Sequence, residues 1–206
     1  MTHRHRTPVR ALALLGLLLA LALQAQAQPR AFTIEDVYRV QGLGDLQISP
    51  DGRQVLYTVT ISDLPRASRQ THIWTMDIDG NGRRQLTFSD KSETAPRFSP
   101  DGRWISFVSA REGAANLYLL PRGGGEARKL TNLSTGVSDP VWSPDSSAIV
   151  FATTVYPECG ADDACNKRIA ERWRQGPLKA HLADRLLYRH WDSWKDGTRT
   201  HLLLVT

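Results

Sequence analysis

Apolar and polar residues alternate along three short stretches of the chain, and each stretch follows the same polar turn. The turn is Ser-Pro-Asp-Gly-Arg at residues 49–53 and 99–103, and it recurs in altered form as Ser-Pro-Asp-Ser-Ser at 143–147. The alternating apolar residues are Val55, Tyr57 and Val59, then Ile105 and Phe107, then Ile149 and Phe151. A period of two is typical of a half-buried β-strand, so the sequence predicts a strand after each turn.

The repeated turn has a mechanical explanation and needs no catalytic one. Proline fixes φ close to the value that the second position of a turn requires, and Ser or Asp side chains hydrogen-bond nearby backbone amides. Glycine accepts the positive φ with which the chain leaves the turn. We therefore interpret the three sequences at 49–53, 99–103 and 143–147, called boxes below, as connections between consecutive strands.

Further strands complete a repeat. A third strand is predicted at residues 72–78 and 116–120, and a fourth, after a Gly-rich hairpin turn, at 83–87 and 127–131. Four antiparallel strands in a unit of roughly 45 residues are the signature of a β-propeller blade. The sequence thus predicts an all-β fold, an incomplete β-propeller of about three four-stranded blades. We place blade one at 43–90, blade two at 93–135 and blade three at 138–206, after a lead-in segment at 28–42.

Blade three is interrupted by a predicted helical insertion at residues 157–200. A charged stretch at 166–175 is a helix candidate, and leucines four residues apart predict a second helix from Pro177 to near Trp191. The strand pattern resumes at His201–Val205, which we assign as the delayed third strand of this blade. Because two and three-quarter blades cannot close into a ring, we expect a fragment of a longer protein or an assembling chain.

The first 27 residues form a secretory signal peptide by their pattern. A basic start leads into an apolar run at 11–23 and then Ala25-Gln26-Ala27, with cleavage expected after Ala27. The run is too short for a membrane-spanning helix, which needs about 20 residues. Three of the arginines behind the formal charge of +5 lie in this segment, which has no acidic residue, so the remainder carries +2. We expect a periplasmic or secreted product that binds neither nucleic acid nor, after cleavage, a membrane.

Two cysteines, Cys159 and Cys165, lie close together in a loop rich in Gly and Asp. In an oxidising compartment this spacing favours a local disulfide that pins a protruding loop. Metal binding would require more Cys or His nearby, so no metal and no cofactor are predicted.

The boxes, together with Ile73–Gly80 and Arg84–Thr87, resemble the repeats of two exported groups. One is the TolB binding propeller, and the other is the N-terminal propeller of the prolyl oligopeptidase family of serine peptidases, in its dipeptidyl- and acylaminoacyl-peptidase branch. The segments Ala183–Gly197 and Phe32–Val37 look like those of the peptidase group. This resemblance implies a propeller that caps an α/β-hydrolase domain and filters oligopeptide substrates by size.

The nucleophile of such peptidases occupies a Gly-x-Ser-x-Gly elbow, which this chain lacks. The nearest string, at Gly136–Pro140, has no second glycine and precedes a blade strand. No catalytic residue is therefore assigned, and the 206-residue chain is expected to be inactive. The alternative function is a non-catalytic TolB-like scaffold of the cell envelope.

Arg189, His190 and Asp192 are the candidate substrate-facing residues, since a cation, a titratable ring and a carboxylate follow the predicted helix around Trp191. They could line the cavity over the active site and hold a peptide terminus. Alternatively, they could anchor the insertion to blade three with Trp191 buried.

Other chemistry-bearing residues favour structural roles. Asp77-x-Asp79-x-Asn81-Gly82 matches half of a Ca²⁺ loop but lacks the closing glutamate, so it is expected to be a hairpin turn. Tryptophans in the blade strands are expected to fill cores or blade interfaces: Trp74, Trp104 and Trp142. His72 and His201 occupy equivalent repeat positions, which predicts a shared structural role.

Overall fold

The structure is a computed structural model that describes residues 30–177, 189–191, 193–194 and 197–206. The chain divides into two compact units, residues 1–37 and 38–206. The strands all belong to the second unit.

A short helix, α2 (Ile34–Arg39), lies in the lead-in segment, where no helix was predicted. Thr33 precedes it, and both the backbone N–H and the hydroxyl of Thr33 donate hydrogen bonds to Asp36 Oδ2, at 2.9 and 3.1 Å. Asp36, at the third helical position, thus reaches back to the N–H of Thr33 as the acidic residue of a capping box does, while its own N–H donates to the Thr33 carbonyl at 3.1 Å. The signal was present in the sequence as Thr33-x-x-Asp36.

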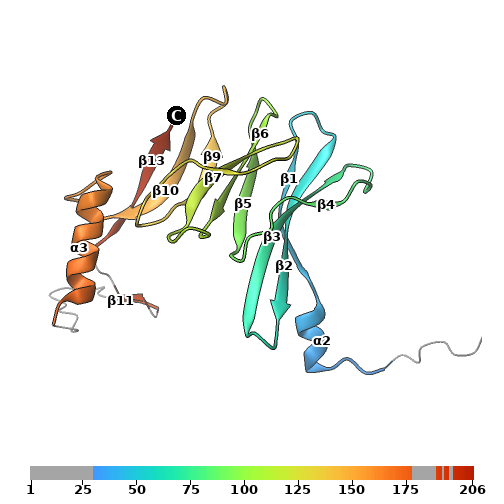
Figure 1. The fold of residues 1–206 in the computed structure, drawn as a ribbon, viewed down its shortest axis with the longest axis horizontal. Helices are drawn as coiled ribbons and strands as arrows, with labels where there is room; N and C mark the ends of the chain where they lie inside the picture. The colour runs from blue at the N-terminus through green and yellow to red at the C-terminus, as the bar shows by residue number, and fades with distance from the viewer. Residues whose placement is uncertain (1–29, 178–188, 192, 195–196) are drawn as a thin grey trace, which may run out of the picture. The chain divides into compact units, whose positions relative to one another are not determined.

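Three antiparallel sheets follow one another in chain order (Figure 1). The first contains β1 (Gly42–Ile48), β2 (Gln54–Asp63), β3 (Ser68–Asp77) and β4 (Arg84–Gln85). The second contains β5 (Glu93–Phe98), β6 (Trp104–Ser109), β7 (Asn116–Pro121) and β8 (Arg128–Lys129). The third has the strand order β13-β10-β9, from β9 (Ser138–Trp142), β10 (Ile149–Val155) and β13 (Arg199–Val205). The predicted all-β fold, an incomplete propeller with a delayed third strand in its last blade, is confirmed.

Two of the three core clusters lie between neighbouring sheets, and the third, of Val55, Tyr57 and Val59, lies on the first sheet alone. Leu56 and Ile73 of the first sheet pack against Ile105 and Phe107 of the second. A second cluster joins the other face of the second sheet to the third, with these members: Val108, Leu117, Leu119, Val137, Ile149 and Phe151. Each sheet therefore buries an apolar face against the next, as stacked blades do.

The three boxes form the same hydrogen-bonded turn between the first and second strands of each sheet. In the second sheet, the Ser99 hydroxyl donates to Asp101 Oδ1 at 2.6 Å and accepts from the Trp104 backbone N–H at 2.9 Å. The first and third boxes repeat both bonds. The third box has lost its glycine, and Ser146 adopts the positive φ there, at 61°. Serine, proline and aspartate are thus present in every copy, whereas glycine is not.

A bulge recurs in the first strand of each sheet, four residues before the box serine. The residues concerned are Asp45, Ala95 and Asp139, with φ values of 48°, 50° and 50°. The strand pairing shifts register beside each of them. A bulge bends its strand and increases the local twist, so this repeated irregularity shapes all three first strands in the same way.

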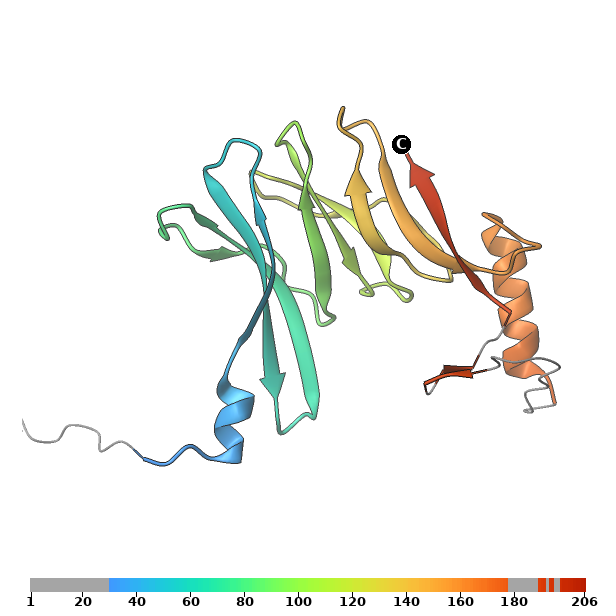
Figure 2. The same ribbon diagram turned by 180° about the vertical axis from the view of Figure 1, so that it is seen from behind.

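The insertion joins the paired residues Val155 and Arg199 of the third sheet, so both of its ends lie at one end of that sheet. It contains α3 (Asp163–Gln175) and a two-strand ladder of β11 (Arg189–His190) with β12 (Ser193–Trp194) (Figure 2). The helix candidate at 166–175 is confirmed and begins three residues earlier than predicted.

The second predicted helix is wrong at its C-terminal end, and its residues 178–188 lie outside the described part of the chain. Arg189 and His190 are extended and paired, and Trp191 has φ 53°, which a right-handed helix does not allow. In the part of the chain that the structure describes, no helix is long and apolar enough to span a membrane.

Candidate functional site

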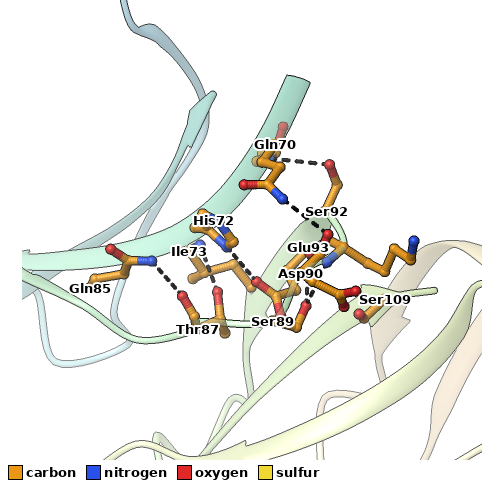
Figure 3. Close-up of polar contacts among 12 residues, drawn as sticks. Gln70, His72, Ile73, Gln85, Thr87, Ser89, Asp90, Ser92, Glu93 and Ser109 are labelled. Carbon is orange, nitrogen blue, oxygen red and sulfur yellow. Dashed lines mark hydrogen bonds and ion pairs between the residues drawn. The ribbon is translucent and has the colours of Figure 1, made fainter. Parts of the chain in front are cut away.

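A buried charge cluster lies at the seam between the first two sheets (Figure 3). His72 in β3 places Nδ1 2.8 Å from Oε2 of Glu93, the first residue of β5. The other carboxylate oxygen of Glu93 accepts a bond of 2.7 Å from Nη2 of Arg111. The Arg111 guanidinium also lies over the rings of Phe107 and Tyr118, 5.3 and 4.8 Å from their centroids. The cluster joins a strand of one sheet to a strand and a turn of the next.

Glu93 is fully buried, yet its surroundings favour the ionised form. Burial alone would raise the pKa of its carboxyl group. Hydrogen bonds from Ser89, His72 and Thr87, together with the positive charge of Arg111, outweigh that effect and hold the pKa below its ordinary value. A buried carboxylate paired in this way stabilises the seam, whereas removal of one partner would leave an uncompensated charge.

The cluster does not have the arrangement of a hydrolytic triad. In a triad the carboxylate contacts one imidazole nitrogen and a serine hydroxyl contacts the other. Here Ser89 bonds to Glu93 itself, and His72 is 9% exposed while Glu93 is 0% exposed. A substrate could not reach either group, so we assign the cluster to sheet stacking.

The connection between the two sheets is held by further polar contacts around the cluster. Gln70 donates to the Asp90 carbonyl at 3.0 Å, and the Thr71 N–H donates to the Ser92 hydroxyl at 3.1 Å (Figure 3). The Ile73 N–H donates to the Thr87 hydroxyl at 3.0 Å. In the second sheet the Leu117 N–H and Thr131 repeat this last bond. These bonds fix where each chain segment enters the next sheet.

The opposite end of the same seam is tied by arginines. Arg122, which follows β7, donates to Gln54 at 3.0 Å and to both carboxylate oxygens of Asp51 in the first box. Arg97 in β5 donates to the bulge residue Asp45 at 2.7 Å. The first box and the first bulge therefore serve as docking points for the second sheet.

His72 and His201 do not share a role in this structure. His72 is buried by the start of the second sheet, whereas His201 is exposed on β13. Asn116 occupies the equivalent position of the second sheet, and its side chain bonds both the N–H and the carbonyl of Leu133 in the connection to the third. The side chain at this repeat position therefore holds two sheets together only where another sheet follows, as it does for His72 and Asn116.

The three blade tryptophans pack against the sheet cores as expected. Trp74 contacts the cluster of Val55, Tyr57 and Val59, and Trp104 and Trp142 contact the core between the second and third sheets. Arginines lie over two of them, Arg83 over Trp74 and Arg128 over Trp104.

The predicted substrate-facing residues Arg189 and His190 form β11, while Asp192 lies outside the described residues. Arg189 lies over the Trp194 ring, 5.6 Å from its centroid. Trp191, at the turn, is 88% exposed. The alternative role, in which a buried Trp191 anchors the insertion to blade three, does not agree with this exposure.

The start of the insertion is anchored firmly. Cys159 and Cys165 form a disulfide. Asn166 is buried, accepts from the Tyr156 N–H at 2.8 Å, and donates to the Gly160 and Asp162 carbonyls. Asp163 accepts bonds of 2.7 Å from the N–H and the hydroxyl of Ser134, in the connection between the second and third sheets. Helix α3 is thereby tied to two different segments of the propeller.

The half Ca²⁺ loop is a turn between β3 and β4. Asp79 accepts from the backbone N–H and the side-chain amide of Asn81, both at 3.0 Å. Within the described ranges, no three or more His, Cys, Asp or Glu side chains come together as a metal site would require.

The comparisons with known proteins agree with this geometry. The TolB beta propeller domain matches residues 40–160, more than half of the chain. The chain belongs to the TolB beta propeller domain family. It is 37% identical to the uncharacterized peptidase YuxL of Bacillus subtilis over 65% of this chain and 20% of that protein. It is 25% identical to dipeptidyl-peptidase 5 of Porphyromonas endodontalis over 89% of this chain and 25% of that protein.

Among solved structures, the acylaminoacyl peptidase of Pyrococcus horikoshii shares the fold with a TM-score of 0.60. The match is 16% identical and covers 82% of this chain and 24% of the peptidase. The propeller fold and the peptidase relatives are consistent with a propeller of the prolyl oligopeptidase family. The chain spans about a fifth to a quarter of the length of the curated relatives named above.

Glu93 and Arg111 were not predicted from the sequence. Glu93 lies in the polar stretch Ser89–Glu93, and such a stretch predicts a solvent-exposed connection between strands. Its partner His72 is 21 residues earlier, and only the stacking of two sheets brings them together. The available signal was the repeat alignment, in which Glu93 replaces the apolar residues Leu43 and Val137.

Proposed function

We propose that this chain is the N-terminal, substrate-gating propeller portion of an exported serine peptidase that cleaves oligopeptides. The observation that carries the proposal is the extent of the likeness to dipeptidyl-peptidase 5. That likeness runs over 183 residues, whereas the propeller repeats recognised in the chain span residues 40–160. The likeness therefore continues beyond the repeats into segments that a general binding propeller does not need.

The residues present indicate which part of the polypeptide would hold the catalytic groups. The chain has no Gly-x-Ser-x-Gly elbow, so the nucleophile and its base would come from an α/β-hydrolase domain elsewhere in the polypeptide. The stacked sheets would limit access to that domain by size. A restricted entrance favours short, unfolded peptides over folded proteins because a folded chain cannot thread through it.

Arg189, His190 and Asp192 are the residues that we propose to face the substrate. Arg189 and His190 form β11 of the β11–β12 ladder, in an insertion that begins and ends at one end of the third sheet, and Asp192 follows them in the sequence. A guanidinium and a carboxylate at this place could bind the charged termini of a peptide through charge-assisted hydrogen bonds.

Export is the second part of the proposal and rests on the segment 1–27. Cleavage after Ala27 would leave Gln28 as the first residue of a periplasmic or secreted protein. An oxidising compartment is compatible with the disulfide between Cys159 and Cys165.

The alternative, a TolB-like scaffold without catalytic activity, is supported by the family to which the repeats belong. A scaffold needs the stacked sheets but no gating residues. It therefore predicts that the protein translated from the whole reading frame hydrolyses no peptide, whatever residues stand at positions 189 and 192.

The test uses the protein translated from the whole reading frame, with peptides of increasing length as substrates. Arg189→Ala with Asp192→Ala should lower kcat/KM for short peptides about tenfold at unchanged melting temperature, since each removes a charged contact to substrate. Arg53→Ala, which removes an exposed arginine from the first box, is the matched control. Unchanged turnover with a lower melting temperature would assign the two residues to folding instead.

A further inference from the structure

The turn between β3 and β4 contains an asparagine that is followed by glycine, Asn81-Gly82, and both residues are exposed. At such a step the glycine nitrogen can attack the side chain of the preceding residue, because glycine has no side chain of its own to hinder the approach. Three comparable steps in the described part of the chain have aspartate before glycine: Asp51-Gly52, Asp79-Gly80 and Asp101-Gly102. The four steps differ in what the glycine nitrogen bonds to.

The three aspartate steps are protected by their own turns. The N–H of each glycine donates to the carbonyl three residues earlier, at 2.8 Å for Gly52 and Gly102 and at 2.9 Å for Gly80. The nitrogen must lose this bond before it can attack. In addition, hydrogen bonds within the turns hold the pKa values of all three aspartates below their ordinary value. Each side chain is therefore an ionised carboxylate, which is a poor electrophile.

The asparagine step lacks both kinds of protection. No described residue accepts a hydrogen bond from the Gly82 N–H. The preceding side chain is a neutral amide, whose carbon is a better electrophile than that of a carboxylate and whose nitrogen can leave as ammonia. Since Asn81 and Gly82 are exposed, water and hydroxide reach both the attacking nitrogen and the amide.

We propose that Asn81 is a site of spontaneous deamidation in the folded protein, and that it reacts ahead of the three aspartate steps. The Gly82 nitrogen gives its proton to a base in the solvent and forms a bond to Cγ of Asn81. The bond from Cγ to Nδ2 breaks, and the side-chain nitrogen takes up a proton and leaves as ammonia. Water then opens the cyclic imide at either carbonyl, which yields aspartate or isoaspartate. The net reaction exchanges ammonia for water, and it is independent of the proposed function.

Asp79 restrains this reaction in the structure. Its carboxylate accepts hydrogen bonds from the backbone N–H and from the side-chain amide of Asn81, both at 3.0 Å. The leaving nitrogen Nδ2 must give up its bond to Asp79 before it departs. These two bonds therefore stabilise the reactant, and their loss should make deamidation faster.

The products should weaken the turn and its contact with the first box. The Asn81 carbonyl accepts from the Asp77 N–H at 2.8 Å, and the Ile78 N–H donates to the Arg53 carbonyl at 2.9 Å. Isoaspartate adds a methylene group to the main chain at position 81. Either product also adds a negative charge next to the carboxylate of Asp79. We therefore expect the converted protein to melt at a lower temperature than the parent.

The test incubates the folded 206-residue chain at neutral and at mildly alkaline pH and follows tryptic peptides by liquid chromatography and mass spectrometry. Cleavage after Arg69 and Arg83 releases residues 70–83, in which Asn81 is the only asparagine. The internal reference is residues 112–122, whose Asn116 is 2% exposed and hydrogen-bonded to Leu133. Asn81 should convert at least about tenfold faster than Asn116, because a buried residue reacts only after local unfolding.

A synthetic peptide of residues 70–83 separates the effect of the fold from that of the neighbouring glycine. Conversion of Asn81 in the folded chain should be within about tenfold of its rate in this free peptide, since an exposed turn opens at little cost in free energy. The rate should rise with pH, because a base removes the Gly82 proton.

Variants test the restraint by Asp79. Asp79→Ala removes two hydrogen bonds to Asn81 and should raise the rate of conversion about two- to tenfold. Asp90→Ala, which removes an exposed carboxylate outside this turn, is the matched control and should leave the rate unchanged. Asn81→Gln should abolish the conversion of this peptide, because the larger imide ring forms far more slowly.

A folded chain in which Asn81 converts no faster than Asn116 would overturn the inference. An Asp79→Ala protein that converts no faster than the Asp90→Ala control, with an unchanged melting temperature, would overturn the restraint assigned to Asp79. Because the measurement is the mass and elution of one peptide, either result leaves the peptidase proposal standing.

Discussion

The aspartates of the three turn boxes are held in their ionised form by hydrogen bonds from their own turns. Bonds from Ser49 and the Arg53 N–H lower the pKa of Asp51 to about 2, and the equivalent bonds lower the pKa values of Asp101 and Asp145 to about 2. The ordinary value is 3.8. Since the folded pKa lies below that value, each aspartate contributes stability above about pH 4 and loses the contribution as the pH falls through about 2.

Asp101→Asn should therefore destabilise the chain at pH 7 and have a smaller effect near pH 2. The amide keeps an oxygen that can accept the Ser99 bond but removes the charge that strengthens it. Urea unfolding at pH 7, 4 and 2.5 measures the difference from the parent protein. A difference that stays constant over this range would contradict the role assigned to the ionised side chain.

Much of the residue-scale chemistry could be predicted from the sequence because it is local. Ser49 and Asp51 are two residues apart and bond each other, so their spacing alone predicts the turn. Glu93 could not be predicted in this way, since His72 and Arg111 reach it only across a sheet interface. The bulge at Ala95 was also missed, because a positive φ at alanine leaves no signal in residue type.

At the scale of elements, the sheets were easier to predict than the insertion. The alternation of apolar and polar residues identifies a strand and shows which of its side chains face the core. The boxes show where the second strand of each sheet begins. In the insertion, leucine spacing predicted a helix as far as Trp191, but Arg189 and His190 pair as a strand. Two strands of two residues each, on either side of a turn, are too short for hydrophobic periodicity to distinguish helix from strand.

The seam between the first and second sheets should be the most sensitive place to substitution. Glu93→Ala removes a fully buried carboxylate and leaves His72 and Arg111 without their acceptor, so it should cost about 3–5 kcal/mol of unfolding free energy. Glu93→Gln should cost less at neutral pH and should flatten the loss of stability below about pH 4.5. The reason is that the lowered pKa of Glu93 contributes stability above its ordinary value of 4.5 and loses it on acidification.

A double-mutant cycle with His72→Ala isolates the pair, and a coupling energy of about 0.5–3 kcal/mol is expected for residues in contact. Asp63→Ala, which breaks the exposed pair with Arg66, is the control and should change stability by at most about 1 kcal/mol. A Glu93→Ala protein as stable as this control would refute the assignment of the cluster to sheet stacking.

At the scale of the whole molecule, the stacking leaves one apolar face of the third sheet uncovered. The corresponding face of the first sheet is buried by Ile105 and Phe107 of the second. Leu202 and Leu204 on β13 remain 73% and 60% exposed. Exposed apolar faces of this kind associate in water, so we expect the 206-residue chain to self-associate.

Leu202→Lys with Leu204→Lys should shift the chain towards monomer, as measured by light scattering during size-exclusion chromatography at several concentrations. Leu64→Lys, at an exposed turn residue away from this face, is the control and should leave the association unchanged. A parent chain that stays monomeric and melts in one sharp transition would contradict the expectation.

We propose that these stacked sheets are the first part of a peptidase, and the coding sequence downstream of Thr206 tests this proposal most directly. We predict further blade repeats followed by a Gly-x-Ser-x-Gly motif between a strand and a helix, with Asp and His after it in chain order. A stop codon after three or four more blades, with no such motif, would contradict the claim and leave the TolB-like scaffold as the function of the chain.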